Sequence, residues 1–206
     1  MKQALGIIVI VFVIFGSSLA SVAGVAPKDD GRADFYQALG ENFRVPESVV
    51  VAIHDRRIPD DDLAVVFSLS KQAGIMPDDV VDLRLLHKSW MELTLHFGLN
   101  PEIFYFPASS DPVPPFAKAY AQYKKLQRVE WKKVVLDDED IVNLVNLRFT
   151  SQYYRVSADE VMRLRAERRS FMAIVKEINS PEYKARMTVS DKKVRPHLRE
   201  PIKKNQ

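Results

Sequence analysis

The sequence predicts an all-α protein built from tandem helix–turn–helix units. Three observations predict it: a helical spacing of apolar residues, a pattern that recurs along the chain, and capping residues ahead of each copy. Neither helix of a unit buries its apolar face alone, so we expect the units to stack into one compact domain or two closely packed small helical domains. The helical spacing is clearest at Val161, Leu164, Phe171, Ile174, Val175 and Ile178.

The pattern recurs upstream at two distances. Moving residues 156–178 back by 81 positions lays them on residues 75–97, with Ser170 on Ser89. Moving them a further 30 positions gives a weaker copy at residues 45–63. Internal repeats of this kind decide an architecture before any single motif does.

Each copy opens with residues that favour the start of a helix. Ser157 and Glu160 have the spacing of a capping box, and Ser170 is a candidate N-cap for the second helix of its copy. Acidic residues in the first turn also oppose the positive end of the helix dipole. Residues 49–53, VVVAI, resemble a buried strand in isolation. Their alignment with the other copies predicts a helix instead.

Residues 1–26 have the pattern of a secretory signal peptide. Lys2 precedes an apolar run at residues 5–15, and small residues follow at 18–23. An uncleaved anchor is the alternative, because residues 4–26 are long enough to span a bilayer. Both interpretations export the rest of the chain. We therefore expect a periplasmic or secreted protein, or one anchored in the membrane and facing the periplasm.

The chain contains no cysteine. Disulfides, covalent haem attachment, thiolate metal sites and cysteine nucleophiles are therefore excluded. An exported domain without disulfides depends on its apolar core for stability. A chain that is 47% hydrophobic is long enough to build one domain or two small ones.

The predicted helices fall into two regions. Residues 27–106 form the first region and contain the copies at 45–63 and 75–97, besides helices at residues 35–43, 63–70 and 102–106. Four prolines within residues 107–115, PASSDPVPP, exclude regular helix there and predict a linker. The second region, residues 116–178, is expected to contain an amphipathic helix at 116–133, a helix at 141–151 and the third copy at 156–178.

Residues 179–206 are predicted to be a disordered basic tail, because apolar residues become rare and no periodicity survives. Residues 161–206 have a charge balance of +8, whereas residues 27–160 have a balance of −6. This asymmetry favours an anionic partner, and solvation of a disordered end is the alternative. The candidate contacts with an anionic surface are Lys192, Lys193, Arg195, Arg199, Lys203 and Lys204.

Aromatic residues flank the proline segment on both sides. If the segment folds back, they line a groove of the kind that suits peptides or sugars. The alternative is that they pack the linker onto the helices. This candidate ligand or partner groove consists of Phe104, Tyr105, Phe106, Phe116, Tyr120 and Tyr123.

No motif indicates catalysis, a cofactor or a metal centre. Glu92 and His96 are four positions apart and are the candidate acid–base or metal-binding pair, although an exposed helical pair explains them as well. The acidic runs at 60–62 and 137–140 lack the glycine of a calcium loop and are interpreted as helix caps. The arginines of residues 163–169 precede an apolar helix, so nucleic acid is not expected as a partner.

We therefore expect an exported helical interaction or scaffold protein that binds a protein or an anionic envelope component. No cofactor and no catalytic residue is predicted, and membrane contact is expected only through the N-terminal segment or the tail. Two alternatives remain. One is a small helical envelope enzyme or metal-binding protein that uses Glu92 and His96, and the other is a structural subunit of an envelope assembly.

Overall fold

A computed structural model describes residues 31–167 and 169–194. Over these residues the chain is all-helical without a strand, as predicted, and no helix combines the length and apolar character needed to cross a bilayer. The predicted signal segment at 1–26 lies outside the described residues. The helices are α1 (Arg32–Phe43), α2 (Glu47–Asp55), α3 (Asp60–Ala73), α4 (Pro77–Leu85), α5 (Trp90–His96), η1 (Pro101–Phe104), α6 (Ala117–Lys124), η2 (Arg128–Lys133), α7 (Asp138–Tyr154), α8 (Ala158–Ala166), α9 (Phe171–Asn179) and α10 (Pro181–Val194).

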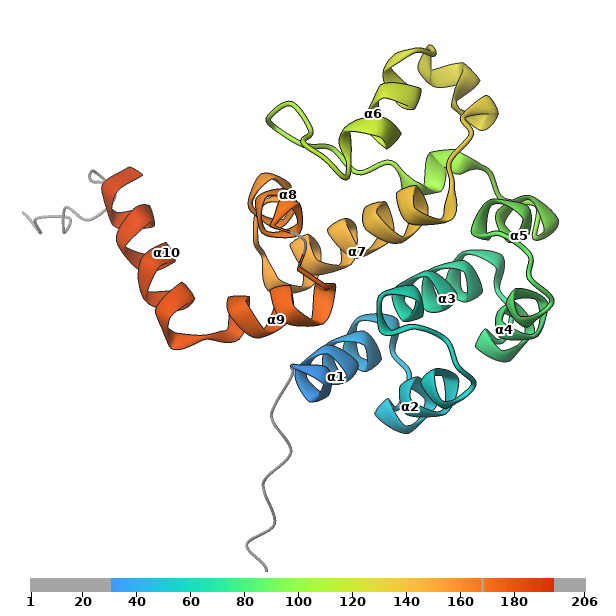
Figure 1. The fold of residues 1–206 in the computed structure, drawn as a ribbon, viewed down its shortest axis with the longest axis horizontal. Coiled ribbons are helices and arrows are strands. Elements are labelled where there is room, and N and C mark those ends of the chain that lie inside the picture. Colours follow the sequence, from blue (N-terminus) through green and yellow to red (C-terminus); the bar gives the residue numbers. More distant parts are fainter. Residues whose placement is uncertain (1–30, 168, 195–206) are drawn as a thin grey trace, which may run out of the picture.

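Two long helices, α3 and α7, pack against each other at the centre of the molecule. The α4–α5 pair flanks them on one side and the α8–α9 pair on the other, while α1 packs on α3, α7 and α9 (Figure 1). The buried apolar residues form one cluster that runs from Phe35 in α1 to Tyr183 in α10. The two regions on either side of the proline segment therefore share a single core.

Three short helices have the same length and the same surroundings in the chain. α2, α4 and α8 each span nine residues, and their first residues lie 30 and 81 positions apart. In each case the next helix begins thirteen positions after the start of the short one. Each short helix also follows a residue in the left-handed conformation, which is Arg44, Gly74 or Arg155.

The α8–α9 pair is fixed to the first turn of α3 through one carboxylate. The Asp61 carboxylate on α3 accepts a hydrogen bond from Arg165 at 3.3 Å and another from the backbone N–H of Phe171 at 3.0 Å. The Arg165 guanidinium also lies 4.6 Å from the centre of the Phe171 ring. Asp61 thus caps the start of α9 from a neighbouring helix, which joins three helices at one buried point.

The α4–α5 pair is fixed in the same way to α7. Arg84 on α4 pairs with Asp138 at 2.6 Å, and the Asp138 carboxylate accepts the backbone N–H of Trp90 at 2.7 Å. The Arg84 guanidinium lies 4.3 Å from the centre of the Trp90 ring. A second carboxylate, that of Asp62 on α3, accepts the Trp90 indole N–H at 3.2 Å and lies 3.5 Å from Arg84.

Burial disfavours the charged form of two of the acidic residues in this network. Desolvation raises the pKa of both Asp61 and Asp62, although Arg165 and Arg84 oppose that rise. Their neighbour Asp60 accepts the hydroxyl of Tyr36 at 2.5 Å and so reaches α1. The acidic run at 60–62, which the sequence suggested is a simple helix cap, therefore serves three different neighbours.

The predicted helix at residues 116–133 is interrupted. The chain forms α6 over Ala117–Lys124 and the 3-10 helix η2 over Arg128–Lys133, with a turn between them. The break brings Trp131 onto α6, where its indole N–H donates to the carbonyl of Tyr123 at 3.2 Å. This hydrogen bond and the ring packing around it outweigh the helical propensity of the segment.

The prediction of a disordered tail from residue 179 onward is wrong for its first part, because α10 occupies Pro181–Val194. Ser180 accepts the backbone N–H of Tyr183 at 3.1 Å, and Pro181 occupies the first turn, where its missing N–H costs nothing. Tyr183 is 3% exposed and anchors the helix to the core. Residues 195–206 lie outside the described part of the chain.

Arg165→Met tests the partly buried contact between α3 and α8. Removing Arg165 leaves the Asp61 carboxylate with only the Phe171 N–H as a partner, so we expect the unfolding free energy to fall by about 1–3 kcal/mol. Arg163→Met is the matched control on the same helix, since the Arg163 side chain is 52% exposed and makes only surface ion pairs. The control should lose less than about 1 kcal/mol. Urea titrations followed by circular dichroism measure both losses, and equal losses would contradict the assignment.

The pH dependence of stability tests the burial of Asp61. Because its pKa is raised in the folded protein, the native state binds more protons than the unfolded state at pH values between the ordinary and the raised pKa. The contribution of Asp61 to the unfolding free energy therefore falls as pH rises through that window. An Asp61→Asn variant cannot titrate at this position. As pH rises from the ordinary aspartate pKa of about 4, the wild type should lose stability relative to the variant, and a relative gain would show that pairing outweighs desolvation.

Candidate functional site

A projecting lobe carries an unusual density of positive charge. We call residues 117–135 the basic lobe; it comprises α6, η2 and the valines that follow, and it stands out beyond α7 at one edge of the molecule (Figure 1). The lobe has six basic residues and one acidic residue, a balance of +5, although residues 27–160 as a whole have a balance of −6. The six cations are Lys118, Lys124, Lys125, Arg128, Lys132 and Lys133.

The cations of the basic lobe are exposed and only weakly engaged. The side chains of Lys118, Lys124, Arg128 and Lys133 are 60–77% exposed, and each pairs with a carboxylate at or near the surface; Lys118 also lies 3.5 Å from the buried carboxylate of Asp140. Lys125 and Lys132 have no ion pair with any described residue. Exposed pairs of this kind contribute only about 0–1 kcal/mol. An external anion can therefore replace the internal partners at little cost.

Two solvent-exposed valines lie in the same segment as these cations. Val129 is 80% exposed and Val135 is 72% exposed, and both values exceed those of every other large apolar residue in the described chain. In a 3-10 helix residues three positions apart share a face, so Val129 and Lys132 project together from η2. Exposed apolar residues within a basic surface are typical of a site that contacts another phase or molecule.

Hydrogen bonds to backbone carbonyls mount the basic lobe rigidly on the body. The Tyr123 hydroxyl donates to the carbonyl of Pro101 at 2.6 Å, and the Tyr120 hydroxyl donates to the carbonyl of Phe106. Arg148 on α7 donates to the carbonyl of Tyr105 at 2.6 Å. Burial raises the pKa of both Tyr120 and Tyr123, which keeps their hydroxyls protonated as donors.

The structure brings the six predicted aromatic residues together in this mount. Tyr105 lies 5.9 Å from Tyr120 and 5.2 Å from Tyr123, ring centre to ring centre. Tyr105 and Phe106 remain half-buried. The other four are at most 4% exposed and fill the space between the proline segment and the helices; in this conformation they are closed to a ligand. These four are Phe104, Phe116, Tyr120 and Tyr123.

The cations predicted in the tail are placed only in part. Lys192 and Lys193 fall in the last turn of α10. Arg195, Arg199, Lys203 and Lys204 lie outside the described residues. Their contact with an anionic surface stays a prediction.

The pair Glu92 and His96 lies on the exposed side of α5. The Glu92 carboxylate accepts the backbone N–H of Ser89 at 2.7 Å and its hydroxyl at 2.8 Å, and these hydrogen bonds lower the Glu92 pKa. Glu92 thus closes the capping box of its own helix. Nowhere in the described residues do three or more histidine or acidic side chains gather as metal ligands.

Sequence reasoning missed the basic lobe. Its signal was the run KKLQRVEWKKVV at residues 124–135, in which five basic residues accompany one acid. The run was averaged into the acidic region that surrounds it, and residues 116–133 were interpreted as one continuous amphipathic helix. In the structure that helix is interrupted, and Val129 and Val135 are exposed.

No family model, no curated protein and no solved structure matches this chain. Similarity therefore assigns it no function.

A Tyr123→Phe variant tests how the basic lobe is mounted. Loss of the hydroxyl leaves the buried carbonyl of Pro101 without its donor, so we expect the unfolding free energy to fall by about 1–2 kcal/mol. Tyr105→Phe is the matched control, because it removes a hydroxyl from the neighbouring ring and should change stability by less than about 0.5 kcal/mol. Hydrogen exchange of residues 117–135 should accelerate in the Tyr123 variant alone. Unchanged exchange there would contradict the mount.

Proposed function

We propose that this chain is an exported helical scaffold protein that binds the anionic surface of a lipid membrane through its basic lobe. The observation that carries the proposal is the exposure of Val129 and Val135 among six basic residues of a rigid lobe. Binding through charge alone does not require exposed valines, and binding through apolar contact alone does not require the cations. A bilayer with anionic headgroups can interact with both.

The charge of the basic lobe supplies the long-range attraction. A basic residue close to an anionic membrane surface gains on the order of 1 kcal/mol. Lys125 and Lys132 are available at once, and the other four exchange weak surface pairs for headgroup contacts. The surrounding acidic body is repelled by the same surface. Within residues 27–160 this opposition favours contact through the lobe.

The two valines supply the short-range attraction. Fully burying a valine side chain gains roughly 1.5–3 kcal/mol relative to leaving it exposed. Trp131 lies between them in the sequence and is half-buried, with its ring 4.4 Å from that of Tyr105. Tryptophan is enriched at membrane–water interfaces, where its amphipathic ring contacts both phases.

The helical body is proposed to be a scaffold made of copies of one two-helix unit. The equal lengths of α2, α4 and α8 and their spacings of 30 and 81 residues support this. The matching contacts of Arg84 and Arg165 support it as well, since these residues are themselves 81 positions apart and each lies over an aromatic ring. Export is supported by the sequence of residues 1–26 alone.

Vesicle co-sedimentation of the full chain tests membrane binding. We expect binding to vesicles of phosphatidylglycerol and phosphatidylcholine, little binding to vesicles of phosphatidylcholine alone, and a decrease with added salt because exposed charges are screened. Lys125→Gln with Lys132→Gln should weaken binding roughly tenfold, since two headgroup contacts are lost. The matched control is Arg57→Gln with Lys71→Gln, which removes two charges elsewhere and should bind like the wild type.

A second pair of substitutions separates a membrane from other anionic partners. Val129→Ser with Val135→Ser keeps every charge, and it should weaken vesicle binding while leaving binding to a soluble polyanion such as heparin unchanged. Equal vesicle binding by this variant and the wild type would remove insertion from the proposal. Capture by heparin without any binding to anionic vesicles would overturn membrane binding altogether.

A further inference from the structure

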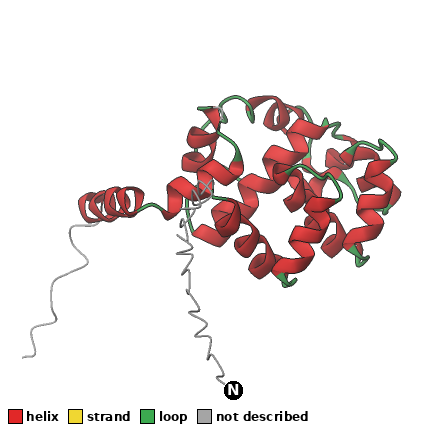
Figure 2. Cartoon of the chain, turned by 60° about the horizontal axis from the view of Figure 1, so that its bottom comes forward, coloured by secondary structure: helices red, strands yellow, loops and turns green. Residues whose placement is uncertain are grey.

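A second candidate site lies at the opposite end of the chain, where α10 leaves the body. α10 packs on α9 and otherwise stands apart from the compact part of the molecule (Figures 1 and 2). Between α10 and the C-terminal ends of α7 and α9 is a cavity of about 440 Å³. This volume is within the range of roughly 300–1,000 Å³ that is usual for small-molecule sites.

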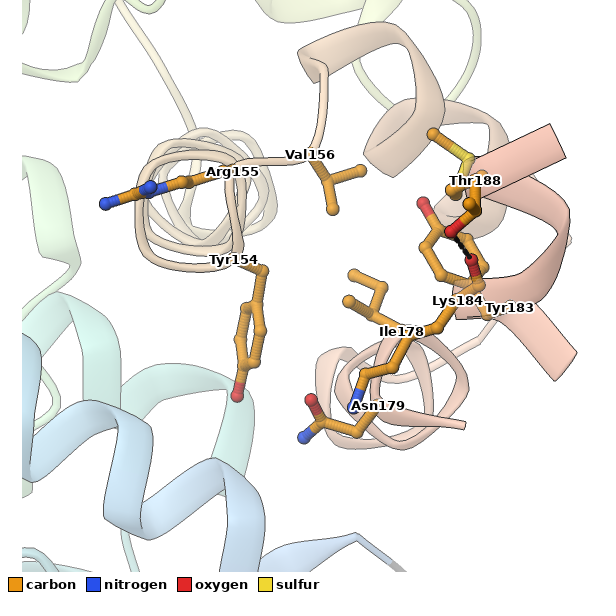
Figure 3. A pocket seen from close by; sticks show the side chains of 9 residues that line it. Tyr154, Arg155, Val156, Ile178, Asn179, Tyr183, Lys184 and Thr188 are labelled. Atoms are coloured by element: carbon orange, nitrogen blue, oxygen red, sulfur yellow. Dashed lines mark hydrogen bonds between the residues drawn. The ribbon is translucent and has the colours of Figure 1, made fainter. Parts of the chain in front are cut away.

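The cavity has an apolar floor. Figure 3 shows a hollow between Tyr154, Val156 and Ile178, with Tyr183 on its far side. Val156 is 9% exposed and Ile178 is 4% exposed, so both belong to the core and present fixed apolar surfaces. Met187 on α10 adds a flexible apolar wall. This lining favours an aliphatic group.

Two tyrosine hydroxyls in the lining lack hydrogen-bond acceptors. Tyr183 is 3% exposed, and its hydroxyl has no partner among the described residues. The Tyr154 hydroxyl is directed toward the amide of Asn179 without a hydrogen bond of normal geometry (Figure 3). Buried hydroxyls are nearly always hydrogen-bonded in native proteins. Their lack of partners here points to a ligand that supplies oxygen acceptors.

Lys184 gives the mouth of the cavity a positive charge. Its side chain runs from α10 toward Asn179, while the Arg155 side chain points away from the hollow (Figure 3). Lys184 has no ion pair with any described residue. The negative ends of the α7 and α9 dipoles oppose an anion. The Asp34 carboxylate opposes it too, and it accepts a hydrogen bond from the Asn179 side-chain amide at 3.0 Å. A unit charge in direct contact outweighs partial charges at a distance, and the Asp34 carboxylate is already bonded to the Asn179 amide.

We propose that this cavity binds a small amphipathic anion: its aliphatic body lies on Val156 and Ile178, and its acceptor head meets Lys184 and the Tyr154 hydroxyl, which lie on the same side of Ile178 (Figure 3). The inference is independent of membrane binding by the basic lobe. It assigns α10 a function, since Tyr183, Lys184 and Met187 all belong to that helix.

Calorimetric titration of the full chain with three ten-carbon probes tests the proposal. We expect saturable one-to-one binding of decanoate, weaker binding of decanol and no saturable binding of decyltrimethylammonium, because only the first presents an anionic acceptor to Lys184. Saturable binding of the cationic probe as tight as that of decanoate would reduce the site to an apolar patch and overturn the proposal, as would no saturable binding of decanoate.

Four variants locate the binding. Lys184→Gln should weaken decanoate binding roughly tenfold by removing a charge-assisted hydrogen bond, and Tyr154→Phe should weaken it several-fold. Thr188→Trp fills the exposed rim of the cavity and should abolish binding without touching the core. Arg57→Gln is the charge-matched control, since Arg57 is exposed and lies outside the lining. Wild-type affinity in both Lys184→Gln and Thr188→Trp would overturn the site.

Lys125→Gln with Lys132→Gln should leave decanoate binding unchanged. This variant keeps the two proposals distinguishable, because it disables only the basic lobe. Loss of decanoate binding in this variant would move the anion site to the lobe and overturn the assignment to α10.

Discussion

The fold depends on carboxylates that cap helices other than their own. The first turn of α3 presents three successive acids, and each serves a different neighbour: Asp60 meets Tyr36 of α1, Asp61 meets the α8–α9 pair, and Asp62 meets the α4–α5 pair. Helices as short as seven or nine residues are unstable alone. At two of these helices a first backbone N–H, which no helix satisfies internally, takes part in the assembly: that of Phe171 is accepted by Asp61 and that of Trp90 by Asp138, whereas Asp60 and Asp62 accept side-chain donors. A chain without disulfides can thereby fix several short helices around one long one.

This arrangement explains why burial of charge is tolerated near the centre of the molecule. An ion pair inside a protein gains little unless further hydrogen bonds satisfy its remaining donors and acceptors. Arg165 donates to the carboxylate of Asp61, to the side-chain oxygen of Asn143 and to the carbonyl of Arg169, and it also covers the ring of Phe171. Because one guanidinium satisfies so many groups, the cost of desolvating Asp61 is partly offset, although its pKa remains raised.

Sequence reasoning reached the local features of the fold more easily than the long-range ones. The helical period and the capping serines follow from neighbours within one turn, whereas the helix at residues 49–53 follows from the alignment of the copies; the structure places helices at all of these positions. The partners of Asp61 are more than 100 positions away, so no local pattern indicates them. The interruption after Lys124 and the helix at Pro181 depend on Trp131 and Tyr183 finding partners elsewhere in the chain. The basic lobe was missed because its positive charge was averaged into the acidic region around it.

The mount of the basic lobe has a geometric consequence. The hydroxyls of Tyr120 and Tyr123 bind the lobe to the backbone of residues 101–106, and Arg148 binds that backbone to α7. The lobe and the body are therefore expected to move together. A bilayer that received Val129 and Val135 would thereby set the tilt of the entire molecule. α2 and α4, which lie across the body from the lobe (Figure 1), would then point into the surrounding solution. Such a rigid attachment would fix the orientation of the protein at a membrane more than it would raise its affinity for the membrane.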